Sequence, residues 1–562
     1  MKRALPARIV LLSAAVLLLS LVAALVFRPD MSVGAAPEFE GVLTYHNNNM
    51  RTGRNSSETS LTLKNVNFNT FGMLFVIPTD GLVDAEPLYV PNVAIPGNGT
   101  HNVLFVASEN DHVYGFDADN GATLWQVTTL KAGETPSDDR GCGQVTPEIG
   151  VTSTPVIDLT AGPHGTIYLV AMSKDSSSNY HQRLHALDIT TGAEEFGGPV
   201  DVAAQYPGMG DNSQGGNVIF DPKQYKERAG LLLLDHIVYT SWASHCDDRP
   251  YTGWIISYNE ATLAQKSVLN VTPNGNEGAI WTAGAGLAAD ESANIYFLDA
   301  NGTFDTTLNG SGFPANGDYG NAIMKLSTRK GQLAVSDYFN MYNTVSESDA
   351  DEDLGSGGAM VVPNFKDGSG VVHELVVGAG KDANIYLANR TNMGKFNPNN
   401  NNQIYQELTG VLAGQVFSAP AFADSSVYYG AVGDHIKAFS FNASGLLNST
   451  PASATATQFA YPGATPSISG SSDSNLILWA TENTSPAVLH AYSARNLGVE
   501  LYNSNQAPGG RDQFGNGNKF ITPTIANGKV YVGTTNGVGV LGLLPATTTT
   551  SLSFPRQRTK GE

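Results

Sequence analysis

The chain has 562 residues, 41% of them hydrophobic, so it holds enough apolar material for a large core and is not globally disordered. Its 31 basic and 51 acidic residues give a net charge of −20. With no basic stripe between the termini, this charge excludes a typical nucleic-acid-binding protein, because phosphate contacts require clustered cations. Only 15% of the residues are charged and 60 are glycine, a composition that favours an all-β protein with many turns.

The N-terminal segment places the basic residues Lys2, Arg3 and Arg8 before an apolar run over residues 9–27. This order is typical of an export signal or of a membrane anchor. The run is close to a membrane span in length, yet small residues that would suit a cleavage site are also present, so both alternatives stay open. We therefore expect residues 1–40 to be a signal or membrane anchor with a linker. The rest of the chain is expected to be exported, either anchored and facing outward or secreted or periplasmic.

A repeated unit fills the region between the two ends. Each copy starts near a proline, continues with two runs of β-branched and aromatic residues, and often closes at a glycine turn; clear copies start at Pro87, Pro155, Pro420, Pro466 and Pro523. Pro155 and Pro420 are 265 positions apart, which fits four units of about 66 and brings the count to eight. This spacing predicts an all-β fold over residues 41–545, an eight-bladed β-propeller of four-stranded antiparallel blades.

The ends of the repeat region predict how the ring closes. The last unit has only about three strands, whereas residues 71–77 form a spare strand ahead of the first full unit. We expect this N-terminal strand to complete the last blade, which would hide sheet edges that are otherwise open to pairing. The polar residues 546–562 are expected to form a disordered tail.

The chain has two cysteines, Cys142 and Cys246, which are 104 positions apart. In an oxidising compartment they can pair, but spacing alone does not decide between a disulfide and two isolated thiols. No Cys-x-x-Cys-His sequence occurs, so we expect no covalently attached haem.

Several repeat turns, at residues 117–125, 184–192 and 489–492, resemble the repeat of the pyrroloquinoline-quinone propeller superfamily. The resemblance covers about residues 60–545 and implies the propeller fold. It does not decide the activity, because the superfamily contains quinone-dependent alcohol dehydrogenases as well as non-catalytic propellers such as the scaffold BamB.

In the quinoprotein alcohol dehydrogenases, a Trp lies under the quinone ring and a Lys or Arg contacts the quinone oxygens. The segment that ends in Trp281 is similar to the family's Trp segment, and the strand after Lys381 is similar to the one that follows its basic residue. The resemblance therefore implies that Trp281 and Lys381 bind the cofactor, pyrroloquinoline quinone. Glu148, in a loop before the second unit, is expected to face the same channel mouth as a third cofactor-binding residue.

The same resemblance implies a Ca²⁺ site. Asn301 follows a strand in the way of the family's Ca²⁺-ligand Asn, and Asp248 stands in the loop where the family has a Glu. Asp353, 28 positions before Lys381, matches the position of the catalytic base. The implied metal ligands are Asp248, Asn301 and Asp353, because Ca²⁺ prefers oxygen donors. The implied catalytic residues are Asp353, as proton acceptor, and Lys381, as the cation that stabilises the reduced quinone.

Each of these residues also has an ordinary structural interpretation. Lys381 fits a common repeat turn, Trp281 fits an apolar plug of the channel, and the acidic run around Asp353 fits a solvated loop. Two functions consequently remain open. One is an oxidoreductase that uses pyrroloquinoline quinone and Ca²⁺ to act on a small alcohol or sugar at the channel mouth. The other is a non-catalytic propeller that binds a protein or polysaccharide at the cell surface.

Overall fold

Short runs of β-branched and aromatic residues form nearly all of the regular structure. The computed structural model describes residue 39 and residues 41–545, so the expected signal or anchor and the expected tail lie outside the described residues. Within the described residues, α2 (Thr344–Asp349) is the single α-helix, and the remaining helical turns are short 3₁₀ segments. No helix of this part of the chain is both long and apolar enough to cross a membrane.

Many neighbouring strands are joined by tight turns that suit antiparallel pairing. Between the strands β37 (Thr524–Ala526) and β38 (Lys529–Thr534), Asn527 and Gly528 both have positive φ, 49° and 73°. Asn-Gly with this geometry forms the two-residue hairpin turn whose twist matches that of the flanking strands.

Five sheets are four-stranded and antiparallel, and their members follow in pairing order. They are β3 (Leu88–Ile95), β4 (Gly99–Ala107), β5 (His112–Asp117) and β6 (Thr123–Thr128); β16 (Leu232–Leu234), β17 (Ile237–Ser241), β18 (Trp254–Asn259) and β19 (Gln265–Asn270); β24 (Met360–Lys366), β25 (Val372–Ala379), β26 (Ile385–Asn389) and β28 (Gln406–Leu408); β29 (Ala421–Ala423), β30 (Ser426–Tyr429), β31 (Asp434–Ser440) and β32 (Ser453–Phe459); and β2 (Phe71–Pro78), β39 (Gly537–Leu543), β38 and β37.

The remaining sheets of the described residues have other strand numbers. Three are larger: β12 (Val200–Asp201), β11 (Tyr180–Asp188), β10 (Thr166–Lys174), β7 (Thr135–Asp138) and β8 (Glu148–Ile149), with β9 (Val156–Asp158) also on β10; β20 (Ala288–Ala289), β21 (Asn294–Leu298), β22 (Ala322–Ser327), β23 (Ala334–Asn340) and β27 (Lys395–Phe396); and β1 (Arg54–Asn55), β33 (Ser467–Ser469), β34 (Ile477–Glu482), β35 (Val488–Ser493) and β36 (Glu500–Asn503). A three-stranded sheet consists of β13 (Gln205–Pro207), β15 (Asn217–Ile219) and β14 (Ser213–Gln214).

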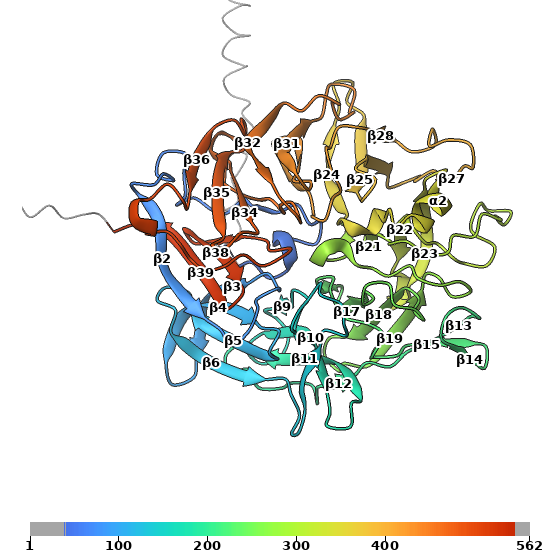
Figure 1. Cartoon of the computed structure of the whole chain (residues 1–562), viewed down its shortest axis with the longest axis horizontal. Coiled ribbons are helices and arrows are strands. Elements are labelled where there is room, and N and C mark those ends of the chain that lie inside the picture. The colour runs from blue at the N-terminus through green and yellow to red at the C-terminus, as the bar shows by residue number, and fades with distance from the viewer. Residues whose placement is uncertain (1–38, 40, 546–562) are drawn as a thin grey trace, which may run out of the picture. The chain divides into compact units, whose positions relative to one another are not determined.

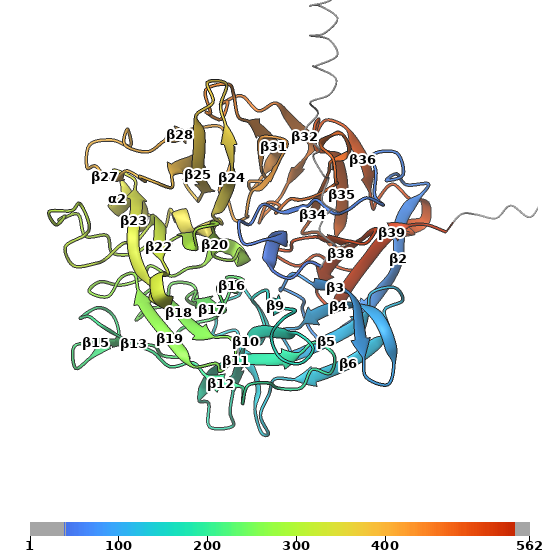
Figure 2. The same ribbon diagram turned by 180° about the vertical axis from the view of Figure 1, so that it is seen from behind.

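The sheets follow one another around a common centre in chain order, the arrangement of a β-propeller (Figures 1 and 2). The cores lie between consecutive sheets: one apolar cluster packs Tyr168 and Leu184 of the β10–β11 pair against Val238 and Trp254 of the next sheet. Trp254 is fully buried there, and truncating such a side chain to alanine typically costs about 3–5 kcal/mol of stability.

The spare strand predicted at residues 71–77 is β2. It pairs antiparallel with β39, from Phe71 opposite Leu543 to Pro78 opposite Gly537, with a register shift between Met73 and Phe75. The N-terminal and C-terminal parts of the described chain therefore belong to one sheet (Figure 1).

The two cysteines form a disulfide, so the pairing alternative is the one present in the structure. Cys142 lies in the loop between β7 and β8, and Cys246 lies in the loop between β17 and β18. The bond thus ties together loops of two different sheets.

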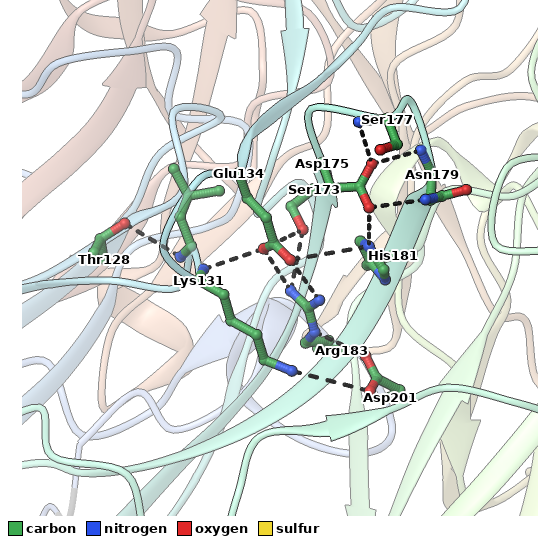
Figure 3. Close-up of polar contacts among 11 residues, drawn as sticks. Thr128, Lys131, Glu134, Ser173, Asp175, Ser177, Asn179, His181, Arg183 and Asp201 are labelled. Carbon is green, nitrogen blue, oxygen red and sulfur yellow. Dashed lines mark hydrogen bonds and ion pairs between the residues drawn. The ribbon is translucent and has the colours of Figure 1, made fainter.

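A network of charged groups anchors the chain just before β7, the strand that leads into the Cys142 loop (Figure 3). The Arg183 guanidinium on β11 donates to both carboxylate oxygens of Glu134, at 2.7 Å each, and to Asp201 at 2.8 Å. Ser173 Oγ and the backbone N–H of Lys131 also donate to Glu134. The bond to Arg183 lowers the pKa of Glu134 to about 2. The segment that leads to Cys142 is therefore anchored to β10 and β11.

We expect Glu134→Gln to lower stability by about 1–2 kcal/mol at pH 7, because each pKa unit corresponds to about 1.4 kcal/mol and solvent screening of this partly exposed carboxylate reduces the effect. The Glu134 pKa in the folded state lies below its unfolded value, so the stabilisation is fully present above about pH 4.5 and is lost as the pH falls toward 2. Urea unfolding at pH 7 and pH 3 measures the difference, which should shrink at pH 3. Glu148→Gln, at an exposed carboxylate beyond the same loop, is the control and should stay within about 0.5 kcal/mol at both pH values.

Replacing both cysteines, Cys142→Ser with Cys246→Ser, should lower stability by about 2–5 kcal/mol, because the link constrains the unfolded chain. Amide hydrogen exchange should become faster in residues 139–147 and 244–251 while exchange in β10 and β11 stays slow. Chemical reduction of the unmodified protein should give the same pattern. Unchanged exchange in the two loops would show that the disulfide does not hold them.

Candidate functional site

A partly open cavity of about 60 Å³ gathers four of the residues singled out by sequence: Trp281, Asn301, Asp353 and Lys381. They come from three sheets, since Trp281 follows β19, Asn301 follows β21, and Asp353, before β24, and Lys381, between β25 and β26, both belong to the β24–β28 sheet. Residues more than 70 positions apart therefore share one wall.

Two glycines allow these loops to approach closely. A Cβ at Gly355 would lie 2.4 Å from the backbone nitrogen of Ala300, and a Cβ at Gly380 would lie 2.4 Å from the carbonyl oxygen of Asp353. Neither position has room for a side chain. The glycines thus place the Asp353 loop against the strand end that carries Asn301 and against the turn that carries Lys381.

Asp353 is the electrostatic centre of the cavity. Its Oδ1 accepts the backbone N–H of Asn301 at 2.8 Å, and its Oδ2 lies 2.7 Å from Lys381 Nζ. Burial raises the pKa of Asp353 to about 6, an effect that Lys381 opposes. Burial lowers the pKa of Lys381 while Asp353 and Asp351 raise it, and the net direction is upward. At neutral pH the pair is therefore a carboxylate beside an ammonium ion.

Two buried oxygen-bearing side chains beside Asp353 have no hydrogen-bond partner among the described residues. They are the amide oxygen of Asn301, which lines the cavity, and both carboxylate oxygens of Asp299. Burial raises the pKa of Asp299 well above its usual range, and the nearby Asp353 charge adds to the effect. Asp299 was not predicted from the sequence, where it is an ordinary residue at the end of a strand.

Trp281 forms an aromatic wall of the cavity. Its indole Nε1–H donates to Gln144 Oε1 at 3.2 Å, and its ring stands perpendicular to Phe520 at 5.1 Å between centroids. Phe417 packs edge-on against Trp281 and, with Tyr461, also lines the cavity. Gln144 lies two residues after Cys142, so the disulfide-linked loop supplies part of this wall.

The structure places Asp247, rather than Asp248, against the cavity. Asp247 lines the cavity, and its Oδ1 accepts hydrogen bonds from Ser244 Oγ at 3.1 Å and Tyr251 Oη at 2.7 Å; Asp248, which is exposed as Asp247 is, lies outside the lining. Cys246 and Asp247 both have positive φ, which turns the chain back at this point. The turn decides which of the two adjacent carboxylates faces inward, and sequence spacing carries no signal for it.

Glu148 also lies away from the cavity. Its side chain is exposed on the two-residue strand β8, whose backbone pairs with β7. Strand pairing, rather than the open loop expected from the sequence, fixes this position. Of the predicted residues, the structure thus brings together Trp281, Asn301, Asp353 and Lys381, and leaves Asp248 and Glu148 outside.

A second cavity of about 610 Å³ adjoins the first and shares Asp247 and Asn301 with it. Its other carboxylates are Glu277, Asp349 and Asp351. Burial and the charge of Asp247 raise the pKa of Glu277. The one arginine in the lining, Arg249, is bound to Asp211 at 2.7 and 2.8 Å. This outer cavity therefore has a negative field that favours cations and hydroxyl donors.

The boundary between the cavities can support two kinds of chemistry. The oxygens of Asn301, Asp353 and Asp247 are the hard donors that Ca²⁺ prefers. Asp353 has a pKa close enough to neutrality to take up a proton from a bound hydroxyl group, and Lys381 can stabilise negative charge on a neighbouring oxygen.

Comparison with protein-family models gives no match, and no curated protein matches the sequence. Solved structures are similar in fold. A quinohaemoprotein alcohol dehydrogenase from Comamonas testosteroni shares 13% identity over 93% of this chain and 84% of that chain, with a TM-score of 0.57. The quinohaemoprotein alcohol dehydrogenase ADHIIG from Pseudomonas putida HK5 shares 13% identity over 93% of this chain and 82% of that chain, with a TM-score of 0.59. At this identity the likeness concerns the fold, and the chain has the propeller fold of the quinoprotein alcohol dehydrogenases.

Proposed function

We propose that the protein is a quinoprotein oxidoreductase that uses pyrroloquinoline quinone and Ca²⁺ to oxidise a small alcohol or sugar at the boundary of the two cavities. The observation that supports this most is the amide oxygen of Asn301, which is buried and unpaired beside Asp353 and Asp247. An unpaired buried acceptor is costly, and a bound cation would satisfy it.

The donor set fits Ca²⁺. Asn301, Asp353 and Asp247 offer one amide and two carboxylates, and two negative charges suit a divalent ion. Asp247 takes the place in this set that the sequence suggested for Asp248. Lys381 already pairs with Asp353 Oδ2, so a bound ion would share this carboxylate with the ammonium group.

The volumes of the two cavities decide where a quinone could fit. The inner cavity of about 60 Å³ is smaller than a tricyclic ligand requires, whereas the outer cavity of about 610 Å³ lies within the usual range for ligands, roughly 300–1,000 Å³. A quinone in the outer cavity would reach past the shared residues Asp247 and Asn301 into the inner cavity, where Trp281 would offer a flat aromatic surface and Ser244, Gln144 and Lys381 would offer hydrogen-bond donors. A bound quinone would supply the acceptor for the hydride of the alcohol carbon. Asp353 would hold the hydroxyl proton, and Lys381 would keep positive charge beside the oxygen that becomes negative.

The proposal includes the assembly and location of the protein. Eight sheets, all except the three-stranded β13–β15 sheet, would form eight blades, and the β2–β39 pairing supports closure of the ring by the N-terminal strand. Export, by a cleaved signal or with a membrane anchor, is supported by the basic and apolar order of residues 2–27 and by the disulfide, which persists in oxidising compartments.

The test is reconstitution of the full chain with pyrroloquinoline quinone and Ca²⁺, followed by dye reduction with short alcohols and aldoses. Asp353→Asn should lower kcat at least 100-fold, because the proton acceptor is lost. Asn301→Ala should raise the Kd for Ca²⁺ at least tenfold, measured by titration calorimetry. Asp248→Asn is the matched control, since it removes a neighbouring carboxylate outside the cavity and should change neither value.

Failure of the quinone to bind at micromolar concentration, with Ca²⁺ present and the fold intact by circular dichroism, would remove the oxidoreductase proposal. The non-catalytic alternative would then take its place. An equal loss of activity in Asp248→Asn and Asp353→Asn would instead show that Asp248, rather than Asp247, belongs to the metal-binding set.

A further inference from the structure

Asp158, His236 and Glu260 form a cluster that has no role in the proposed function. In the antiparallel sheet β16–β19, His236 lies in the β16–β17 turn and Glu260 follows β18 at the β18–β19 turn. These turns are at the opposite end of the sheet from the β17–β18 loop, which carries Asp247. The cluster is therefore separate from the cavity. Asp158 reaches it from β9, in the preceding sheet.

The potential ligand atoms of the three residues lie within 4.8 Å of one another. His236 Nδ1 is 2.5 Å from Glu260 Oε1, while Glu260 Oε2 is buried and has no hydrogen-bond partner among the described residues. Glu260 as a whole is 7% exposed. Asp158 Oδ1 accepts two hydrogen bonds from Thr160, at 2.7 Å each, and the Asp158 carboxylate lies close enough to Glu260 to form a hydrogen bond with it when Glu260 is protonated.

The two neighbouring carboxylates of the cluster create a negative potential that favours a bound cation. Burial raises the pKa of Glu260, His236 opposes this shift, and the neighbouring Asp158 carboxylate raises the pKa further. Two carboxylates thus repel each other at a site where one of them has an unpaired buried oxygen. A divalent ion would neutralise this repulsion and satisfy Glu260 Oε2 together.

The chain itself provides comparisons for this cluster. His101 Nδ1 pairs with Asp117 at 2.9 Å, and His164 Nδ1 pairs with Asp188 at 2.6 Å. In both, as in His236–Glu260, the histidine stands near the start of a sheet's second strand and the acid near the end of its third. Within residues 39 and 41–545, Asp158, His236 and Glu260 are the only such group with three ligands. The third ligand, the Asp158 carboxylate contributed by the neighbouring sheet, is what distinguishes it.

We propose that Asp158, His236 and Glu260 bind one Zn²⁺ ion. One imidazole nitrogen and two carboxylates match Zn²⁺, which accepts nitrogen and oxygen ligands, better than Ca²⁺, which prefers oxygen alone. Three protein ligands leave the fourth tetrahedral position to water. The His236 side chain is 76% exposed, which gives the ion a path from solvent. Because Asp158 belongs to one sheet and the other two ligands to the next, the ion would join two sheets of the propeller.

The test uses the full chain, stripped of metal with a chelator and then dialysed against Zn²⁺ alone or Co²⁺ alone. We expect one Zn²⁺ per chain, a visible absorption band with Co²⁺, and a rise in the thermal midpoint that depends on metal concentration. His236→Ala and Asp158→Ala should each weaken Zn²⁺ binding at least tenfold and abolish the Co²⁺ band. Both residues are partly or largely exposed, so these variants leave the buried core unchanged.

Two controls make the result specific. His164→Ala removes a histidine–carboxylate pair of the same kind without a third ligand and should retain one Zn²⁺. Asp353→Asn alters the cavity alone and should also retain it, so the outcome is independent of the proposed function. The proposal is overturned if the unmodified chain binds no more Zn²⁺ than His236→Ala, or if Asp353→Asn rather than His236→Ala removes the ion.

Discussion

Each sheet of the propeller has two apolar faces, and neither face can be buried except against another sheet. Strand β18 shows the constraint directly, because Trp254, Ile256 and Tyr258 belong to the core on one side while Ile255 belongs to the core on the other. This period of two is that of a strand covered on both faces. Since every sheet needs two neighbours, the chain surrounds a centre, and loops from distant sheets meet at each end of that centre.

The same constraint brings polar groups into the middle of the molecule. Residues 45–51 form hydrogen bonds with several of these groups. Arg51 is fully buried and donates to the carbonyl oxygens of Leu287, Tyr45 and Leu231, which belong to separate parts of the chain. Glu86 accepts the backbone N–H of His46. Burial lowers the pKa of Arg51 to about 10 and raises that of Glu86 to about 8. Buried ionisable groups are therefore found elsewhere in this fold as well. Asp353 differs because it lines a cavity beside an unpaired acceptor.

The sequence could predict the propeller because its repeats report local strand pairing and two-sided burial, which depend on short segments. The resemblance to the quinoprotein alcohol dehydrogenases also pointed to Trp281, Asn301, Asp353 and Lys381, which the structure brings to one cavity. The sequence could not distinguish Asp247 from Asp248, because their orientation depends on the positive-φ turn at Cys246. Asp299 and the cluster at His236 were missed for a related reason: unpaired buried oxygens and contacts between sheets have no sequence signature.

The Cys142–Cys246 disulfide lies next to the candidate site, and a disulfide persists only under oxidising conditions. Asp247 follows Cys246 directly, and Gln144 lies two residues after Cys142, so the one covalent link between sheets in the described chain lies beside two residues that line the cavity. In a reducing compartment the link would open, and two surface loops would lose their shared restraint. The basic and apolar N-terminus, which is independent of the cysteines, predicts export to oxidising conditions.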